Sequence, residues 1–218
     1  MEFLFAVAVV VFAYLVGSIN FAVIFSKVFL KKDVRSMGSG NAGTTNVMRN
    51  AGFLPGALTF VCDALKGFVA SFAGKLVFDY LLTSMEIEWA MPVYGAYLCG
   101  LACMLGHVFP VFFQFKGGKG VATSVGIFAV CCPIAIILGL CVFALLTIIT
   151  KYVSLSSIVA TVTVVVLSLV FNERDASIIP QAVLCVAMGA IVIIKHKTNI
   201  VRLLNGTESK VGGKKKNG

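Results

Sequence analysis

The stretch MEFLFAVAVVVFAYLVGSINFAVIFSK, residues 1–27, contains no charged side chain between Glu2 and Lys27. A helix needs about 20 apolar residues to cross the hydrocarbon core of a bilayer, and this stretch supplies them. A secretory signal peptide has a basic leading region and a shorter apolar segment, whereas the first basic residue here comes at the far end. We therefore expect a retained membrane helix near residues 3–26, with the N-terminus outside.

The composition of the whole chain is typical of a polytopic membrane protein. Of the 218 residues, 59% are hydrophobic and 12% are charged, whereas a soluble domain has roughly 25% charged residues. Further apolar segments lie at 55–80, 90–106, 119–131, 133–150, 153–171 and 178–194. The segment at 119–131 is short and runs into Cys-Cys-Pro. The sequence predicts an all-α integral membrane protein with about seven transmembrane helices, in a single domain over residues 1–218.

The basic residues are distributed unevenly over the predicted loops. With the N-terminus outside, fifteen of the eighteen Lys and Arg residues fall in loops or in the tail on the cytoplasmic side. This asymmetry follows the positive-inside rule, so we expect a cytoplasmic C-terminus. We interpret residues 209–218, which include GGKKKNG, as a disordered basic tail near anionic lipid, and we expect no nucleic-acid partner.

The cysteines and histidines do not form a recognisable metal-binding pattern. All seven cysteines lie in or beside apolar runs, and no Cys-x-x-Cys pair occurs. The two histidines have no cysteine at metal-ligand spacing. Cys99 and Cys103 could in principle share a metal on one helix face, but we interpret them as small apolar packing residues. We therefore expect no metal site and no cofactor.

The first of three polar clusters is MGSGNAGTTNVMRN, residues 37–50. Its glycines let backbone N–H groups converge on an anion, and its hydroxyl and amide side chains add neutral donors. Arg49 could bind a phosphate with two parallel hydrogen bonds. An ordinary cytoplasmic loop is the alternative, although the run is dense in such groups and has no acidic residue. We take Ser39, Asn41 and Arg49 as candidate substrate-binding residues.

The second cluster is GHVFPVFFQFKGGKGVATS, residues 106–124. Its glycines and lysine come just before an expected helix, whose N-terminus attracts phosphate through free N–H groups and its dipole. The pattern is not a Walker loop, which has a longer glycine spacing and a lysine followed by Ser or Thr. The neighbouring phenylalanines suggest an amphiphilic ligand with a phosphate head. The candidate phosphate-binding residues are Lys116, Gly117, Gly118, Lys119 and Gly120.

The third cluster is KHKTNIVRLLNGTESK, residues 195–210. On a continuing helix, His196 and Asn199 would share a face because they are three residues apart. A basic collar next to the membrane is the alternative, and we prefer it for Lys195 and Lys197. It explains His196 and Asn199 less well, because neither is needed for positive charge at neutral pH.

Asp63 and Lys66 are ionisable residues inside the second predicted helix. Such groups are costly within a membrane and are usually paired or functional. At a spacing of three residues they can pair with each other. We favour this pairing over direct contact with a substrate, and the sequence leaves both interpretations open.

The three polar clusters fall on the same predicted side of the membrane. No Ser-His-Asp triad, paired carboxylate or metal set is evident, so chemistry there would rely on anion binding, orientation and a good leaving group. A transporter of phosphorylated metabolites is one alternative, but it predicts polar groups at mid-membrane and internal repeats. A structural membrane protein is another, and it leaves three anion-binding loops unexplained.

These clusters carry a resemblance to a known family. GSGNAGTTNVMR (38–49), GHVFPVFFQFKGGKGVAT (106–123) and HKTNIVRLLNGTE (196–208) resemble, in order, the three cytoplasmic motifs of the bacterial acyl-phosphate:glycerol-3-phosphate acyltransferase family, the PlsY type. DVR (33–35) and DALKG (63–67) are also similar to the family. Thr44, where members often carry Ala, is a mild departure.

The resemblance implies a multi-pass enzyme of the bacterial plasma membrane with its active site facing the cytoplasm. The reaction would move a fatty acyl group from acyl phosphate to the 1-hydroxyl of glycerol 3-phosphate. It would give lysophosphatidic acid and phosphate, as the first acylation step of phospholipid synthesis. Acyl-CoA and acyl carrier protein are not the family's donors, and an upstream enzyme that forms acyl phosphate would be a partner.

The resemblance also implies residue roles. The implied roles are Ser39 and Arg49 for binding of glycerol phosphate, Lys119 together with Lys116 for contact with phosphate, and Gly117, Gly118 and Gly120 for binding of acyl phosphate. His196 and Asn199 would be catalytic and orient the glycerol and the reacting carbonyl, while Glu208 would brace the third loop. Asp63 and Lys66 would give structural support. Either His196 or the donor's own phosphate could accept the hydroxyl proton, and the family resemblance favours the phosphate.

Overall fold

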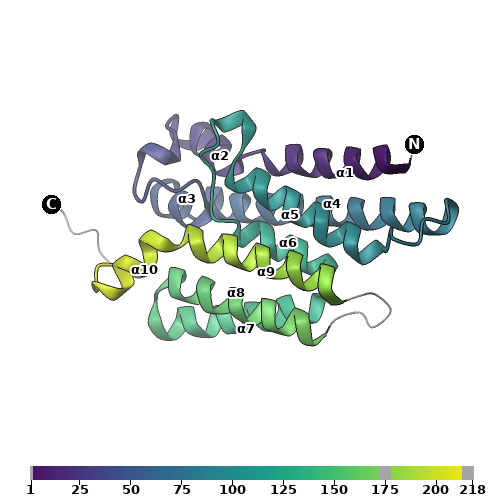
Figure 1. Cartoon of the computed structure of the whole chain (residues 1–218). Coiled ribbons are helices and arrows are strands. Elements are labelled where there is room, and N and C mark those ends of the chain that lie inside the picture. The colour runs from purple at the N-terminus through teal and green to yellow at the C-terminus, as the bar shows by residue number, and fades with distance from the viewer. Residues whose placement is uncertain (1, 172–177, 213–218) are drawn as a thin grey trace.

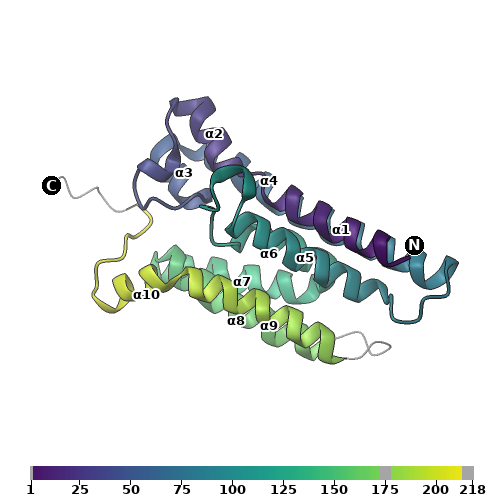
Figure 2. The same cartoon turned by 45° about the horizontal axis from the view of Figure 1, so that its top comes forward.

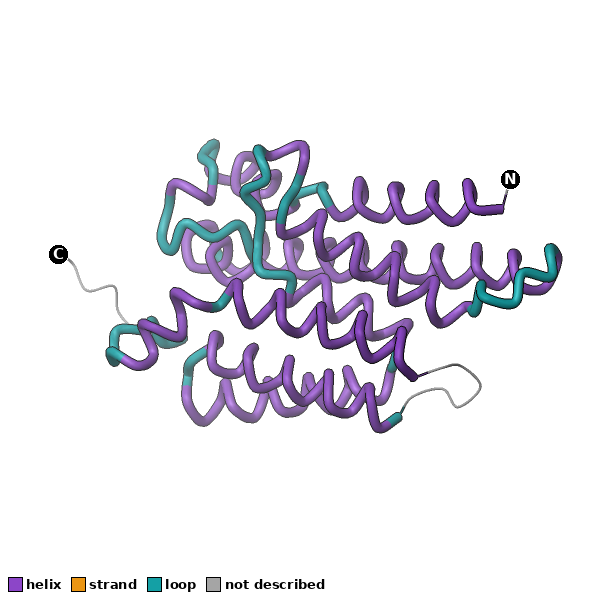
Figure 3. The backbone as a smooth tube through the Cα atoms, in the orientation of Figure 1, coloured by secondary structure: helices purple, strands orange, loops and turns teal. Residues whose placement is uncertain are grey.

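The structure of the chain, a computed structural model, describes residues 2–171 and 178–212. Within these residues every regular element is a helix (Figure 3). The α-helices are α1 (Glu2–Gly17), α2 (Phe21–Leu30), α3 (Thr44–Ala51), α4 (Phe53–Ser84), α5 (Pro92–Val108), α6 (Val121–Cys131), α7 (Pro133–Thr150), α8 (Val153–Val170), α9 (Ile178–Lys195) and α10 (Lys197–Leu204). Two short 3-10 helices, η1 (Val34–Ser36) and η2 (Val111–Phe113), lie in the loops.

Six stretches of the described chain are long and apolar enough to cross a membrane. They are Phe3–Leu30, Phe53–Ser84, Pro92–Phe113, Pro133–Thr150, Val153–Val170 and Ile178–Lys195. The seventh expected segment forms α6, which is apolar but has only 11 residues. At 1.5 Å per residue it rises about 16 Å, roughly half of a hydrocarbon core of about 30 Å. The expected all-α membrane fold is confirmed, with six full-length candidate spans and one half-length helix.

The first expected helix is interrupted at residues 18–20, which separates α1 from α2. Gly17 packs so closely against the α5 backbone that a side chain there would overlap it. The Asn20 side chain caps α2 by accepting a backbone N–H. Lys66 Nζ donates to the carbonyl of Ile19 at 2.7 Å, which satisfies a backbone group that the break sets free. The expectation of one continuous helix over 3–26 was therefore wrong in this detail.

The helices pack as two groups joined by α9 (Figures 1 and 2). In the first group α1 and α4 pack against α5, and α6 packs on α4. In the second group α7 pairs with α8, and α9 contacts both α8 and α5. Gly74 of α4 and Gly95 of α5 let their backbones meet, because a Cβ at either position would overlap the other's carbonyl. Close helix contacts therefore hold the scaffold that carries the loops.

The loops with the three polar clusters meet at one end of the bundle, at the left of Figure 1, opposite the start of α1. We call this the polar end, formed by residues 31–52, 109–120, 150–154 and 195–212. The α7–α8 turn belongs to it, because the backbone N–H of Val211 donates to the carbonyl of Lys151 at 2.8 Å. Of the expected tail, residues 213–218 lie outside the described residues, as does the loop 172–177.

Candidate active site

A polar cavity of about 200 Å³ lies at the polar end, where the three clusters converge. It is lined by Ser39, Gly40, Asn41, Lys119, Lys195, Thr198, Asn199 and Arg202. The first three residues precede α3, Lys119 precedes α6, and the others come from the end of α9 and from α10. Among the described residues that line it, none is acidic and three are cationic. The cavity is therefore suited to anionic ligands.

Asn46, buried in α3, holds the first loop in shape. Its Nδ2 lies 3.0 Å from the carbonyl oxygens of Val34, Met37 and Asn41. Its Oδ1 accepts the backbone N–H of Ser39 at 3.2 Å. Because one amide ties together the turns on both sides of Ser39, this wall of the cavity is fixed before any ligand binds.

The loop that carries the second cluster packs closely against α5 and against the loop that carries the first cluster. We call these the second loop and the first loop. The N–H of Gly118 donates to the carbonyl of His107 at 3.1 Å. A Cβ on Gly118 would overlap both the His107 ring at Nε2 and the carbonyl oxygen of Ala42. A Cβ on Gly117 would overlap the His107 carbonyl oxygen. These glycines are required by close packing, and that packing brings Lys119 to the cavity.

Arg35 fastens the outer part of the second loop to the first. Its Nη1 donates to the carbonyl of Phe113 at 2.9 Å and contacts that of Lys116 at 3.4 Å. Asp33 holds the guanidinium in place, with Oδ2 2.8 Å from Nη2. The DVR stretch, which precedes the first cluster in the sequence, therefore holds the second cluster in space.

Glu208 accepts hydrogen bonds from three polar side chains around the third cluster. Its Oε1 accepts from Asn199 Nδ2 at 2.8 Å and from Ser154 Oγ at 3.0 Å, and its Oε2 accepts from Arg202 Nε at 2.7 Å. Burial opposes ionisation, but these three donors hold the pKa of Glu208 below its usual value. The carboxylate is therefore charged at neutral pH and turns the Asn199 amide so that its Oδ1 faces away from Glu208.

Lys119 is the cation that joins the second and third clusters. Its Nζ donates to Asn199 Oδ1. Burial lowers the pKa of Lys119 to about 8; attraction by Glu208 opposes this, and repulsion by Arg202 and Arg49 adds to it. Lys119 is therefore protonated at pH 7 and loses its charge as the pH rises through about 8.

His196 lies at the junction of α9 and α10 and is 2% exposed. Its Nδ1 lies 2.8 Å from the carbonyl oxygen of Val192; because a carbonyl only accepts, Nδ1 carries the proton and Nε2 does not. Burial, together with the charge of Lys119, lowers the pKa of His196 to about 4, so the ring is neutral at pH 7. The expected continuous helix is broken here, since α9 ends at Lys195 and α10 begins at Lys197.

The structure brings together part of the predicted site. The predicted residues that line the cavity are Ser39, Asn41, Lys119 and Asn199. Those that lie in the same loops but outside the described lining are Arg49, Lys116, Gly117, Gly118, Gly120, His196 and Glu208. Arg49 Nη2 donates to the carbonyl of Ser209 at 3.1 Å. Binding by the residues outside the lining stays a prediction.

Asp63 and Lys66 lie deeper, between α4 and α5, and neither belongs to the described lining of the cavity. Lys66 Nζ is 2.7 Å from Asp63 Oδ1, and both side chains are at most 3% exposed. The two side chains therefore form an internal ion pair.

Four cavity residues were not among the predicted candidates: Gly40, Lys195, Thr198 and Arg202. Lys195, Thr198 and Arg202 are separated by three and four residues, the spacing of one helix face. That spacing was available in the sequence and pointed to the face that carries Asn199. The collar interpretation was too narrow for Lys195, which lines the cavity and whose Nζ lies 4.6 Å from the ring centre of Phe109.

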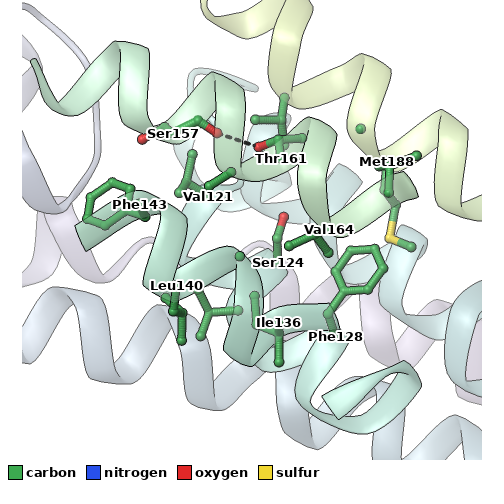
Figure 4. Close-up of a pocket in the computed structure, with 16 residues that line it drawn as sticks. Val121, Ser124, Phe128, Ile136, Leu140, Phe143, Ser157, Thr161, Val164 and Met188 are labelled. Carbon is green, nitrogen blue, oxygen red and sulfur yellow. Dashed lines mark hydrogen bonds between the residues drawn. The ribbon is translucent and has the colours of Figure 1, made fainter. Parts of the chain in front are cut away.

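An apolar groove is enclosed by α6, α7, α8 and α9 (Figure 4). Its apolar wall includes Val121, Phe128, Ile136, Leu140, Phe143, Val164 and Met188. Ser124, Ser157 and Thr161 also line it, but each hydroxyl donates to a backbone carbonyl of its own helix region. The groove therefore presents an apolar surface despite these hydroxyls.

Residues that line the groove are close in the sequence to residues that line the polar cavity. Val121 lines the groove and follows the cavity residue Lys119 by two positions. Val192 lines the groove and precedes the cavity residue Lys195 by three positions. A molecule with a phosphate head and an apolar chain could therefore occupy both at once.

Comparisons with known proteins agree with this geometry. The family model described as Glycerol-3-phosphate acyltransferase matches residues 7–206. Glycerol-3-phosphate acyltransferase 2 of Bacillus anthracis is 41% identical, over 92% of this chain and 96% of the relative. The glycerol-3-phosphate acyltransferase of Thermoanaerobacter sp. (strain X514) is also 41% identical, over 97% of this chain and 98% of the relative.

Solved structures match over nearly the whole chain as well. The crystal structure of PlsY, an integral membrane glycerol 3-phosphate acyltransferase, in its glycerol 3-phosphate form superposes with a TM-score of 0.82 at 36% identity, over 95% of this chain and 96% of that one. Its lysophosphatidic acid form gives a TM-score of 0.78 at 36% identity, over 94% of each chain. Sequence, fold and site geometry thus agree that this chain belongs to the glycerol-3-phosphate acyltransferase family of the PlsY type.

Proposed function

We propose that the protein transfers a fatty acyl group from acyl phosphate to the 1-hydroxyl of glycerol 3-phosphate, giving lysophosphatidic acid and inorganic phosphate. Membership of the family supports the acyltransferase activity on glycerol 3-phosphate. The observation that supports acyl phosphate as donor is that a cavity lined by three basic residues and an apolar groove are lined by residues two positions apart, Lys119 and Val121. This donor carries its phosphate directly on the acyl carbonyl, so its head suits the cavity and its chain suits the groove.

The cavity supplies charge for two phosphates and neutral donors for the glycerol. Three basic residues line it: Lys119, Lys195 and Arg202. We assign Ser39 and Asn41 to hydrogen bonds with glycerol phosphate, because both lie on the fixed wall of the first loop.

Arg49 and the second loop complete the proposed phosphate contacts. Within residues 2–171 and 178–212, Arg49 makes one hydrogen bond, to the Ser209 carbonyl, and its charge acts on Lys119. We assign it to glycerol phosphate. Lys116 and the backbone of residues 117–120, at the start of α6, are assigned to the phosphate of the donor.

The proposed chemistry needs no strong protein nucleophile. The 1-hydroxyl oxygen attacks the acyl carbonyl carbon, the bond from that carbon to the phosphate oxygen breaks, and the hydroxyl proton passes to the departing phosphate. His196 is neutral with a free Nε2, but a pKa of about 4 makes it a weak base. We therefore assign His196 and Asn199 to hydrogen bonds that orient the hydroxyl and the carbonyl.

We further propose that the polar end faces the cytoplasm of the bacterial plasma membrane and that the N-terminus lies outside. The predicted excess of basic loops and the position of α1's start at the opposite end of the bundle support this orientation (Figure 1). An upstream enzyme that forms acyl phosphate would then supply the donor from the same side.

The donor is tested directly with purified protein in detergent or lipid. Palmitoyl phosphate and glycerol 3-phosphate together are expected to give equal amounts of phosphate and lysophosphatidic acid, measured by phosphate assay and mass spectrometry. Turnover with palmitoyl-CoA but not with palmitoyl phosphate would reject the proposed donor. Phosphate release without glycerol 3-phosphate would indicate a hydrolase instead.

Ala160→Leu tests whether the groove holds the acyl chain. Ala160 is a half-buried residue of α8 on the groove wall, and a leucine there would displace about two methylene groups of a bound chain. At about 0.8 kcal/mol for each methylene, KM for palmitoyl phosphate should rise roughly tenfold, while butyryl phosphate should be turned over as by the wild type.

The matched control for this change is Val162→Leu, two residues along α8. Val162 is 46% exposed and is not among the described groove residues. Its variant should keep the wild-type ratio of kcat/KM for the two donors. An equal loss for both donors in Ala160→Leu would show that the groove does not hold the chain.

A further inference from the structure

A buried ionic cluster lies next to the cavity and has no part in the proposed reaction. It consists of Asp63 and Lys66 from α4 and His107 from α5. Lys66 Nζ lies 2.7 Å and His107 Nδ1 lies 3.5 Å from the same oxygen, Oδ1 of Asp63. The three side chains are at most 4% exposed. Ionisable groups at such a depth are costly, which raises the question of what this cluster does.

His107 connects the cluster to the loop that carries Lys119. Its carbonyl accepts the N–H of Gly118 at 3.1 Å. The Nε2 edge of its ring lies against Gly118 on one side, and the carbonyl of Ala42 lies against Gly118 on another. Gly118 directly precedes Lys119, so displacement of the His107 ring would shift Lys119 relative to the first loop.

The cluster is anchored at its other side to the break in the first helix. Lys66 Nζ bonds the carbonyl of Ile19 as well as the carboxylate of Asp63. The position of the His107 ring is therefore defined by α4, by α5 and by the α1–α2 break together. Contacts from α4, α5 and the α1–α2 break therefore converge on His107, which packs against the loop that carries Lys119.

Helix packing alone does not require these groups. α4 and α5 already meet at Gly74 and Gly95, and a buried ion pair can often be replaced by apolar side chains without loss of stability. An apolar residue at position 107 would not place a ring nitrogen 3.5 Å from the carboxylate of Asp63.

We propose that Asp63 and His107 are positioning residues for Lys119. Asp63 orients the imidazole, and the imidazole together with its own carbonyl sets the position of the Gly-Gly-Lys-Gly loop against the first loop. This inference rests on the proposed role of Lys119 as a phosphate ligand.

Asp63→Asn and His107→Ala are the informative changes. We expect each to lower kcat/KM for glycerol 3-phosphate roughly 10- to 100-fold, because misplacing a binding group by about 1 Å can cost a factor of 100. The alkaline limb of the rate profile, near pH 8 in the wild type, should move upward, since a displaced Lys119 regains water. His107→Asn retains an N–H donor near the position of Nδ1 and should recover part of the activity.

The shift of the alkaline limb reports the position of Lys119 only if the charged groups around Lys119 are the same in the variants as in the wild type. The charged and titratable groups that face Lys119 are Lys195, His196, Arg202 and Glu208 from the third cluster and Arg49 from α3. None of them is altered in these variants. The double variant Asp63→Asn with His107→Ala should be no worse than His107→Ala alone, because both changes remove one connection.

Cys99→Ala is the matched control for a structural effect. Cys99 is buried in α5 against Gly74, about two turns from His107 and on the part of the helix away from the loop. It should lower the melting temperature without changing KM or the alkaline limb. The positioning role is rejected if the other variants also lose only melting temperature, with KM and the alkaline limb unchanged as in Cys99→Ala. These variants are Asp63→Asn, His107→Asn and any folded His107→Ala.

Binding of radiolabelled glycerol 3-phosphate separates this inference from the role on which it rests. Normal binding by Lys119→Met would reject Lys119 as a ligand for the phosphate of glycerol 3-phosphate. Lost binding in Lys119→Met with unchanged binding and kinetics in the Asp63 and His107 variants would reject the positioning role only. Weakened binding in Lys119→Met and in the Asp63 and His107 variants, with a shifted alkaline limb of the rate profile in the latter, supports both the role of Lys119 and the positioning role.

Discussion

Lys119→Met is expected to lower kcat/KM for acylation of glycerol 3-phosphate about 1000-fold. Lys119 lines the polar cavity and lies two residues before the groove residue Val121, and we expect its ammonium group to bind the phosphate of either substrate. Removing one positioned donor from a site that stabilises developing charge typically costs a factor of 100 to 1000, and here the donor also carries the charge. Methionine keeps the apolar stem, so the effect reports the ammonium. Steady-state phosphate release at pH 7 with each substrate varied measures it.

Lys197→Met is the control, because Lys197 is an exposed basic residue of the same polar end that is not among the described cavity residues. It should keep nearly full activity. A similar loss in both variants would mean that the overall positive charge of the polar end matters, and that Lys119 has no specific contact.

The pKa of Lys119 also predicts how KM for glycerol 3-phosphate depends on pH. Because burial lowers its pKa to about 8, the side chain is charged below that pH and neutral above it. KM for glycerol 3-phosphate should therefore rise as the pH passes 8. In Lys119→Arg the guanidinium remains charged, so this limb should disappear while part of the activity remains. An unchanged limb in Lys119→Arg would assign the titration to another group.

The membrane helices could be predicted closely because hydrophobic length is a local property. Residues 133–150 were expected as a helix, and α7 has the bounds Pro133–Thr150. The break at residues 18–20 could not be predicted in this way. It depends on the α5 backbone against Gly17 and on Lys66 from α4, both far away in the sequence.

Four of the eight described residues that line the cavity were among the predicted candidates, and the contacts between the loops were not predicted. The sequence identified Lys119 and Asn199, which make a direct hydrogen bond. It did not indicate why Gly118 is a glycine, because the reason is its contact with His107 and with Ala42 in another loop. Spacing suggests partners within one helix, whereas contacts between loops follow only from the packed bundle.

Glu208→Gln is expected to lower kcat/KM about 100-fold, although the two side chains have nearly the same shape. The carboxylate accepts from Asn199, Arg202 and Ser154. A glutamine that keeps its oxygen toward Arg202 points its own NH2 at the NH2 of Asn199. The Asn199 amide must then rotate and turn its NH2 toward Lys119, so the ammonium loses its acceptor and moves. Steady-state kinetics on equal amounts of folded protein measure the loss, which arises from misplaced binding groups.

A double exchange tests this orientation argument. In Asn199→Asp combined with Glu208→Gln, the net charge equals that of the wild type, and the new carboxylate at 199 can accept from the new amide and from Lys119 at once. We expect at least a tenfold recovery relative to Glu208→Gln. Ser154→Ala, the control, removes one donor but leaves Asn199 and Arg202 bound, so it should lose less than threefold. If the exchange recovers nothing, or if Ser154→Ala is as poor as Glu208→Gln, then Glu208 supports the α7–α8 turn and does not control the direction of the Asn199 amide.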